Sequence, residues 1–258
     1  MIYKTLLVSE EDGIGLIRLN RPTLMNALNA QMRAEITAAV RDLGGRMRVL
    51  VLTGEGRAFC SGQDLGDGAS VNELDLGRIL REEYEPMLRA IYDCPVPVIS
   101  AVNGAAAGAG ANLALAADVV IATQSAVFLQ AFTRIGLIPD AGGTYWLPRL
   151  VGFARAMGQA LFAEKLTADE AAAQGLIWAS VPDEHFAAEW QRRAAQLANG
   201  PTLAYGAVKR AMRASLTSDL EAQLDLEAQL QGEMGRTRDF REGVMAFLEK
   251  RPAKFEGR

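Results

Sequence analysis

Residues 101–122, AVNGAAAGAGANLALAADVVIA, are the segment that most restricts how this chain can fold. The segment is long and apolar enough to suggest a membrane-spanning helix, but three polar residues and many glycines interrupt it. The runs VPVISAV (96–102) and DVVIAT (118–123) at its two ends are typical of buried strands. We therefore predict two buried strands that flank a short helix of small residues, as in an α/β core.

The rest of the first 200 residues continues this alternation. Further strands are predicted over residues 5–10, 14–20, 48–54 and 177–181, and the first two read as a hairpin. Residues 29–43 place Met32, Ile36, Val40 and Leu43 at helical spacing, and residues 72–92 form a second amphipathic pattern. Thr167 followed by Glu170 matches the capping box that begins a helix.

The last 58 residues differ from the rest because their pattern is purely helical. Charged amphipathic helices are predicted near 201–215, 218–235 and 237–250, the second with a capping box from Ser218 and Glu221. We predict a boundary near residue 200, with an α/β core over 1–200 and a helical region over 201–258. Because these helices have little core of their own, the pattern favours oligomerisation.

Composition narrows the classes of function. A net charge of −4 and a pI near 5.3 argue against nucleic acid and anionic membranes as partners. The N-terminus lacks the pattern of a secretory signal, and Cys60 and Cys94 have no metal-ligand spacing, which favours buried thiols in a reducing cytoplasm. His185 is the only histidine, so we expect neither a histidine-based triad nor a metal site.

Two glycine-rich stretches follow buried strands, GRAFCSGQDL (56–65) and NGAAAGAGANLAL (103–115). Such loops bring backbone N–H groups close to a ligand oxygen, and the second also opens a helix, whose N-terminus is the positive end of its dipole. A dinucleotide loop is not supported, because Leu113 stands where the third glycine of that motif belongs. Glycines that merely allow tight packing of helix on sheet are an equally good interpretation of the spacing.

Six segments together resemble the crotonase, or enoyl-CoA hydratase/isomerase, family. They are LNRPTLMNALN (19–29), RAFCSGQDL (57–65), VNGAAAGAGANLALAADVVIA (102–122), GLIPDAGGTYWLPRLVG (136–152), LTADEAAAQGLI (166–177) and REGVMAFLEKRPAKF (241–255). They run in the family's order over nearly the whole chain. The resemblance implies a ClpP-like spiral of ββα turns, with a C-terminal helical tail that mediates homotrimers, often paired into hexamers. It also implies acyl-CoA thioester substrates, enolate stabilisation, and no cofactor apart from the coenzyme A of the substrate.

The resemblance also assigns roles to individual residues. By position, the backbone N–H groups of Gln63 and Ala109 form the oxyanion hole, where two preorganised donors favour the negative charge of an enolate. The implied substrate and coenzyme A contacts are Ala27, Ser61, Asp64, Leu65, Gly110, Asn112, Phe132 and Lys250. Asp64 is expected mainly to hold the loop that presents Gln63. Lys250 is expected to approach the coenzyme A phosphates, often of a neighbouring subunit, or else to be an exposed lysine at a helix end.

Two departures from the hydratase pattern change the expected chemistry. The two glutamates of hydratases correspond here to Asn112 and Phe132, neither of which transfers a proton at neutral pH. At the position where hydratases tend to have glycine, this chain has Asp140, and an aspartate there recurs in isomerases and in a dehalogenase-type branch. From the residues alone, Asp140 would be a turn residue or a helix N-cap. The resemblance makes it the predicted catalytic acid/base.

An apolar pocket is expected around this carboxyl group. Phe132 and Ile138 are its predicted walls, with Tyr145 as a further candidate, and their desolvating effect would raise the pKa of Asp140. Tyr145 and Trp146 are otherwise expected to pack rather than to react.

The sequence therefore predicts an acyl-CoA isomerase. Within the family it most resembles the isomerases of phenylacetate degradation, in GAAAGAGANLAL, in FTRIGLIPDAGGTYWLPRLVG and in the tail from LDLEAQLQG onward. That subgroup converts a ring-epoxide of phenylacetyl-CoA to an oxepin-CoA and shifts the double bond of a dehydroadipyl-CoA. Two alternatives stay open: an enoyl-CoA hydratase, which is a lyase, and a non-catalytic acyl-CoA-binding member of the family.

Overall fold

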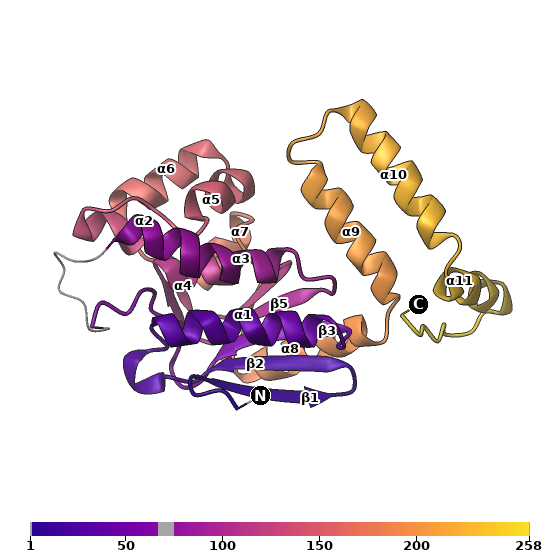
Figure 1. Cartoon of the computed structure of the whole chain (residues 1–258), viewed down its shortest axis with the longest axis horizontal. Coiled ribbons are helices and arrows are strands. Elements are labelled where there is room, and N and C mark those ends of the chain that lie inside the picture. The colour runs from indigo at the N-terminus through magenta and orange to yellow at the C-terminus, as the bar shows by residue number, and fades with distance from the viewer. Residues whose placement is uncertain (1, 67–74, 258) are drawn as a thin grey trace.

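The computed structural model describes residues 2–66 and 75–257, which form an α/β body and a helical tail (Figure 1). The strands of the larger sheet are β1 (Leu6–Glu11), β2 (Ile14–Leu19), β3 (Val49–Gly54), β5 (Val98–Val102), β7 (Val119–Thr123) and β10 (Ala179–Val181). They pair in the order β1-β2-β3-β5-β7-β10, antiparallel between β1 and β2 and parallel elsewhere. The predicted hairpin is confirmed, since Leu6 pairs with Leu19 and Glu11 with Ile14.

A smaller sheet lies beside it, and the sequence did not predict its strands. These are β4 (Ala58–Cys60), β6 (Ala105–Ala107), β8 (Val127–Leu129) and β9 (Leu166–Thr167), paired in that order. Strands of two or three residues are too short to show a hydrophobic period. Because β4, β6 and β8 each follow a long strand and precede helical turns, the chain repeats a strand–strand–helix unit. The predicted spiral of ββα turns is therefore confirmed.

Helices cover both faces of the larger sheet. They are α1 (Ala30–Gly44), α2 (Leu76–Ile79), α3 (Glu85–Tyr92), α4 (Ala109–Leu115), α5 (Gly143–Val151), α6 (Phe153–Phe162), α7 (Ala168–Ala173) and α8 (Asp183–Ala198). Leu50 and Leu52 of β3 belong to the main core with α1, α3 and α4, whereas Val49 and Val51 pack on the α8 side with Phe186. Since successive side chains of a strand point to opposite faces, a strand covered on both sides is apolar throughout.

Two predicted helices differ in detail from the structure. The helix predicted over 72–92 is present from residue 76, with a π turn at Leu80–Tyr84 between α2 and α3, and residues 72–74 lie outside the described part. The capping box at Thr167 is confirmed. The one predicted at Ser218 is wrong, because Asp219 is the N-cap and its carboxylate accepts the Ala222 N–H at 2.9 Å.

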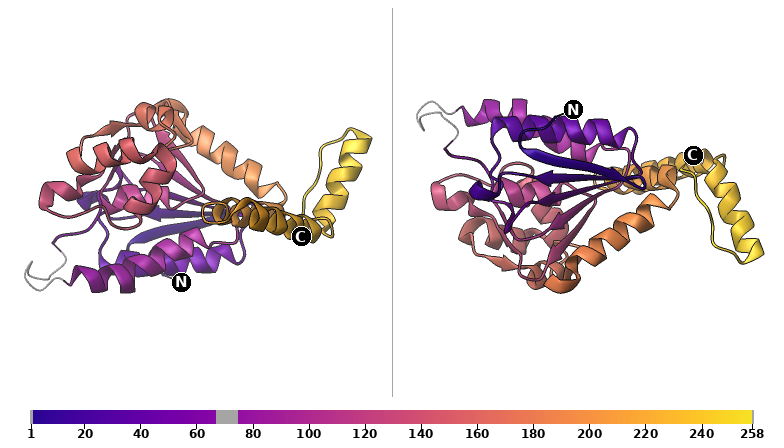
Figure 2. Two further views of the ribbon diagram at one scale, coloured as in Figure 1. Left: turned by 90° about the horizontal axis from the view of Figure 1, so that it is seen from above. Right: turned by 90° about the horizontal axis from the view of Figure 1, so that it is seen from below.

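The tail consists of α9 (Thr202–Ala214), α10 (Leu220–Met234) and α11 (Arg238–Glu249), as predicted. Helix α9 is fixed to the body where Lys209 and Arg213 pair with Asp118 at 2.7 and 2.6 Å. Helix α11 stands away from the body in both views of Figure 2. The division of the chain at residue 200 stays a prediction. Within the described ranges, no helix has the length and apolar character needed to cross a membrane.

Candidate active site

The two glycine-rich stretches meet where β4 ends and α4 begins. A Cβ atom on Gly62, whose φ is +97°, would lie 2.8 Å from the Ala107 carbonyl oxygen and 3.4 Å from the Ala109 nitrogen. A Cβ on Gly110 would lie only 2.3 Å from the Cys60 carbonyl oxygen. The packing interpretation of these glycines is therefore confirmed, and their role in binding a ligand oxygen stays a prediction. They allow tight packing, and that packing sets the loop that contains Gln63 against the N-terminus of α4.

Two backbone N–H groups near this junction are available to a ligand. Ala109 is the first residue of α4, and the first intrahelical bond is made later, from the Asn112 N–H to the Gly108 carbonyl at 3.2 Å, so Ala109 has no acceptor within its helix. In the loop, Gly62 accepts from the Leu28 N–H at 2.8 Å and the Asp64 N–H donates to Leu28 at 3.1 Å. Since successive N–H groups of an extended segment alternate in direction, that of Gln63 points away from Leu28.

The side chain of Gln63 is held by residues that the sequence did not single out. Its Oε1 accepts from the Tyr84 hydroxyl at 2.5 Å and from the Arg33 guanidinium at 2.9 Å. Arg33 is 2% exposed, donates also to the Leu28 carbonyl at 2.8 Å, and pairs with Glu83 at 2.5 Å. The guanidinium carbon lies 4.8 Å from the centre of the Tyr84 ring. We call Arg33, Glu83 and Tyr84 the Gln63 clamp, because together they fix the residue whose N–H is the predicted donor.

The sequence contained a signal for some residues of the Gln63 clamp. Tyr84 ends the π turn, and such turns are frequent at functional sites, but the sequence predicted an uninterrupted helix there. Arg33 lies three residues before Ile36 and seven before Val40, on one face of α1, so its burial could have been predicted. What it pairs with depends on residues 50 positions away.

The predicted coenzyme A contacts on the loop lie together. Asp64 pairs with Arg21 at 2.8 Å, and Arg21 also donates to the Ala27 carbonyl at 2.6 Å. Burial is the largest single influence and acts against ionisation of Asp64, but the hydrogen bonds from Arg21 and the Gly66 N–H, with the charges of Arg21 and Arg33, together lower the pKa of that carboxyl. Ser61 is held in the same loop, where its N–H donates to the Met25 carbonyl at 3.0 Å. The carboxylate thus holds the loop, as expected for Asp64.

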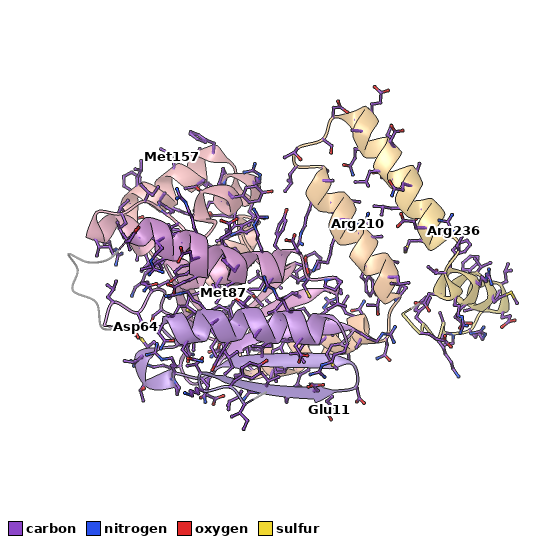
Figure 3. The ribbon with its side chains drawn as sticks, in the orientation of Figure 1. Glu11, Asp64, Met87, Met157, Arg210 and Arg236 are labelled. Atoms are coloured by element: carbon purple, nitrogen blue, oxygen red, sulfur yellow. The ribbon has the colours of Figure 1, made fainter. Side chains whose placement is uncertain are left out.

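Two further predicted contacts, Leu65 and Lys250, lie at opposite ends of the molecule. Leu65 is 66% exposed next to Asp64, which Figure 3 labels at the end of the body farthest from the tail. Lys250 is exposed at the C-terminal end of α11, and Figure 1 shows that this helix lies at the opposite end of the molecule. Within one chain, Lys250 is therefore not brought to the site, and its contact with coenzyme A stays a prediction that requires a neighbouring subunit.

Asp140 lies in the turn before α5, with its carboxyl group half-buried and unpaired. Its Oδ1 is buried and has no hydrogen-bond partner among the described residues. Burial raises the pKa of Asp140 to about 6. The N-cap of α5 is Gly142, so the alternative in which the Asp140 side chain caps this helix is contradicted. Burial raises the pKa of the Tyr84 hydroxyl, and the charge of Asp140 raises it further to a smaller extent. Asp140 is therefore close enough to the Gln63 clamp to act on it electrostatically.

The predicted pocket walls are only partly realised. Phe132, in the short helix Ala131–Ile135, is buried, and its ring tip lies 3.8 Å from where a Cβ on Gly108 would be. Ile138 is 76% exposed, so it is not a wall within this chain. The reason is that this non-helical segment turns Pro139 inward and Ile138 outward. Tyr145 packs edge-on against Trp146, with ring centres 4.8 Å apart, in line with a packing role.

Asn112 contacts the turn of Asp140 instead of presenting an acid. Its side chain is completely buried, and its Nδ2 donates to the backbone carbonyl of Asp140 at 2.7 Å. Its Oδ1 accepts from Gln130 at 2.9 Å. The site thus combines the Ala109 N–H at the N-terminus of α4 and the Gln63 N–H of the neighbouring loop with a carboxyl group whose Oδ1 has no partner among the described residues, a set suited to proton transfer beside a stabilised oxyanion.

Known proteins resemble this chain over its full length. The sequence profile described as enoyl-CoA hydratase/isomerase matches residues 9–258. A protein of Rhodobacter capsulatus named "Probable enoyl-CoA hydratase" is 66% identical over 258 residues, with 100% of both chains covered. The 1,2-epoxyphenylacetyl-CoA isomerase of Escherichia coli is 46% identical and covers 96% of this chain and 97% of its own. The crystal structure of an enoyl-CoA hydratase from Bacillus anthracis superposes with a TM-score of 0.94 at 32% identity, covering 99% of this chain and 100% of that one.

Proposed function

Because this chain belongs to the enoyl-CoA hydratase/isomerase family, we propose that it is an acyl-CoA isomerase in which Asp140 transfers the proton. The observation that carries the proposal is the buried, unpaired Oδ1 of Asp140, in a carboxyl group whose pKa is raised to about 6. A carboxyl group that titrates close to neutrality can both accept and return a proton.

The proposed reaction leaves the composition of the substrate unchanged. The Asp140 carboxylate removes a proton from a carbon of the acyl chain, and the electron pair moves onto the thioester oxygen. The N–H groups of Gln63 and Ala109 stabilise that oxyanion, and each such donor contributes about 10²–10³ in rate. The protonated Asp140 exchanges its proton with solvent and then gives a proton to a different carbon, which shifts the double bond. The resemblance to the phenylacetate-degradation isomerases, and the 46% identity to the isomerase of Escherichia coli, support a ring-epoxide to oxepin rearrangement as a second reaction of the same residue.

An enoyl-CoA hydratase is the second candidate, because the relative with 66% identity has that name. Hydration needs a group that activates water and one that protonates carbon. The amide of Asn112 and the ring of Phe132 occupy the two positions where hydratases have glutamates. Neither group can activate water or protonate carbon. The hydratase would therefore have to depend on Asp140 alone.

A panel of CoA thioesters tests the proposal. We expect the purified protein to shift the double bond of a 3-enoyl-CoA, and to add water to crotonyl-CoA at least 100-fold more slowly. Asp140→Asn should abolish the isomerisation. Rapid hydration of crotonyl-CoA that persists in Asp140→Asn would contradict the proposal.

The assembly and location are part of the proposal. A hollow of about 690 Å³ between α9, α10 and α11 has an apolar lining that includes Leu203, Leu230 and Phe247, and this supports a homotrimer or a pair of trimers built through the tail. Light scattering on the purified protein measures that mass directly. Cys60 and Cys94 are buried free thiols, which supports a location in the reducing cytoplasm. That the enzyme needs no metal and no cofactor apart from the coenzyme A of its substrate stays a proposal.

A further inference from the structure

The turn that presents Asp140 has an unfavourable backbone. The Gly143 N–H donates to the Asp140 carbonyl at 2.8 Å, and the two residues between them, Ala141 and Gly142, have φ values of +47° and +84°. Glycine adopts this left-handed region freely, but alanine does so at a cost. The turn therefore depends on contacts from outside its own sequence.

Asn112 supplies such a contact from α4. Besides the Gly143 N–H, the Asp140 carbonyl accepts the Asn112 amide N–H at 2.7 Å. A Cβ on Gly143 would lie 2.5 Å from Asn112 Nδ2, so only glycine leaves room for this bond. Gln130, itself 5% exposed, donates to Asn112 Oδ1 at 2.9 Å, and this orients the amide with its N–H toward the turn.

The same helix carries a predicted oxyanion-hole donor. Ala109 and Asn112 are three residues apart on α4, which places them on one face of the helix. Every residue of α4 is buried, so the helix is held on all sides. The distance between the Ala109 N–H and the turn of Asp140 is therefore set by one rigid element and one hydrogen bond.

A neutral donor is required at this position. A carboxylate at residue 112 could not donate to the Asp140 carbonyl, and it would add a second negative charge beside the first. The amide of Asn112 donates to the Asp140 carbonyl and adds no charge beside the carboxyl group.

We propose that Asn112 is a positioning residue: its amide, oriented by Gln130, ties the Asp140 turn to α4 and fixes the carboxyl group relative to the oxyanion hole. The inference rests on the proposed function, since positioning matters only if Asp140 transfers the proton.

The test compares Asn112→Asp with Asn103→Asp in the isomerisation of a 3-enoyl-CoA. Asn103 is a matched control, because its Nδ2 also donates to a backbone carbonyl, that of Gly56 at 2.9 Å, and no hydrogen bond between Asn103 and Asp140 occurs among the described residues. We expect Asn112→Asp to lower kcat about 100-fold with KM changed less than threefold, and to move the acidic limb of the pH–rate profile upward. Asn103→Asp should leave that profile in place.

A second variant covers a failure of Asn112→Asp to fold. Gln130→Met removes only the orienting donor, and we expect kcat to fall about tenfold with little change in KM. Folded Asn112→Asp or Gln130→Met protein with wild-type kcat and pH profile would overturn the positioning role. Asp140→Asn, assayed alongside, separates the two claims: full turnover there refutes the proposed function, whereas an inactive Asp140→Asn beside a wild-type-like Gln130→Met refutes only the positioning.

Discussion

The two halves of the candidate site are built from opposite kinds of interaction. The loop of Gln63 is held by charges that are all paired, Arg33 with Glu83 and Arg21 with Asp64. The turn of Asp140 is held by neutral amides, and its carboxyl group has no charged partner in the described part of the chain. A donor must be rigid, and ion pairs provide rigidity. A proton-transfer group must titrate near neutrality, and an adjacent cation would lower its pKa.

Breaking the buried ion pair of the Gln63 clamp should have the largest effect on stability. Arg33→Met leaves Glu83 with only its longer contact to Arg78, at 3.4 Å, and Gln63 Oε1 without one of its two donors. We expect a loss of about 3–5 kcal/mol in the free energy of unfolding, measured by urea denaturation. Arg46→Met is the control, because Arg46 pairs with Glu10 and Asp42 on the surface and should contribute less than about 1 kcal/mol. Equal losses in the two variants would contradict the role given to the clamp.

The role of the Asp140 carboxyl group is best tested by measuring the rate as a function of pH. If the Asp140 carboxylate is the base, kcat should fall about tenfold per pH unit below a pH of about 6. Burial raises the pKa of the nearby Tyr84 hydroxyl, so this group stays protonated over that range. A rate that is flat down to pH 5 would mean that Asp140 is not exchanging the proton.

A smaller effect is expected from the phenol of the clamp. Tyr84→Phe removes the 2.5 Å hydrogen bond to Gln63 but leaves the one from Arg33. We expect kcat to decrease about fivefold, equivalent to about 1 kcal/mol, with KM nearly unchanged. Tyr205→Phe, in α9 of the tail, should show no change. A purely increased KM in Tyr84→Phe would instead indicate a lost substrate contact.

The smallest expected effect is a gain in stability. The pKa of Asp140 is about 6 in the folded protein against 3.8 as its ordinary value, so folding is weakened as pH rises between these values and stays weaker above them. At pH 7, Asp140→Asn should therefore be more stable by roughly 1 kcal/mol after allowance for partial solvent exposure. Calorimetry should show a Tm about 2–4 °C higher at pH 7, with the gain vanishing near pH 4. A gain of equal size at both pH values would have another cause.

The long elements of this fold are readable from the sequence because each carries a period. The strands near 48–54 and 96–102 and the helix after Asn29 were predicted almost to the residue. The short strands β4, β6 and β8 were not, since three residues in a glycine-rich loop have no period. They matter nonetheless, because β4 and β6 lead directly into the loop of Gln63 and into α4.

The site was predictable to a similar degree. Asp140 was identified through a resemblance and not through any local pattern, since an aspartate in a glycine-rich turn is ordinarily a turn residue. Asn112 in an apolar helix had to have hydrogen-bond partners, but sequence could not say that they are Gln130 and the Asp140 carbonyl. Contacts between residues 18 and 28 positions apart depend on how the spiral stacks its turns.

Incorporation of solvent deuterium into a 3-enoyl-CoA, followed by NMR in wild-type and Asp140→Asn protein, tests the central claim most directly. Proton transfer through Asp140 predicts rapid incorporation by the wild type and a decrease of about 10²–10⁴ in the variant, the range expected for a lost acid/base group. Incorporation at the wild-type rate in Asp140→Asn would contradict the claim that this carboxyl group carries the proton.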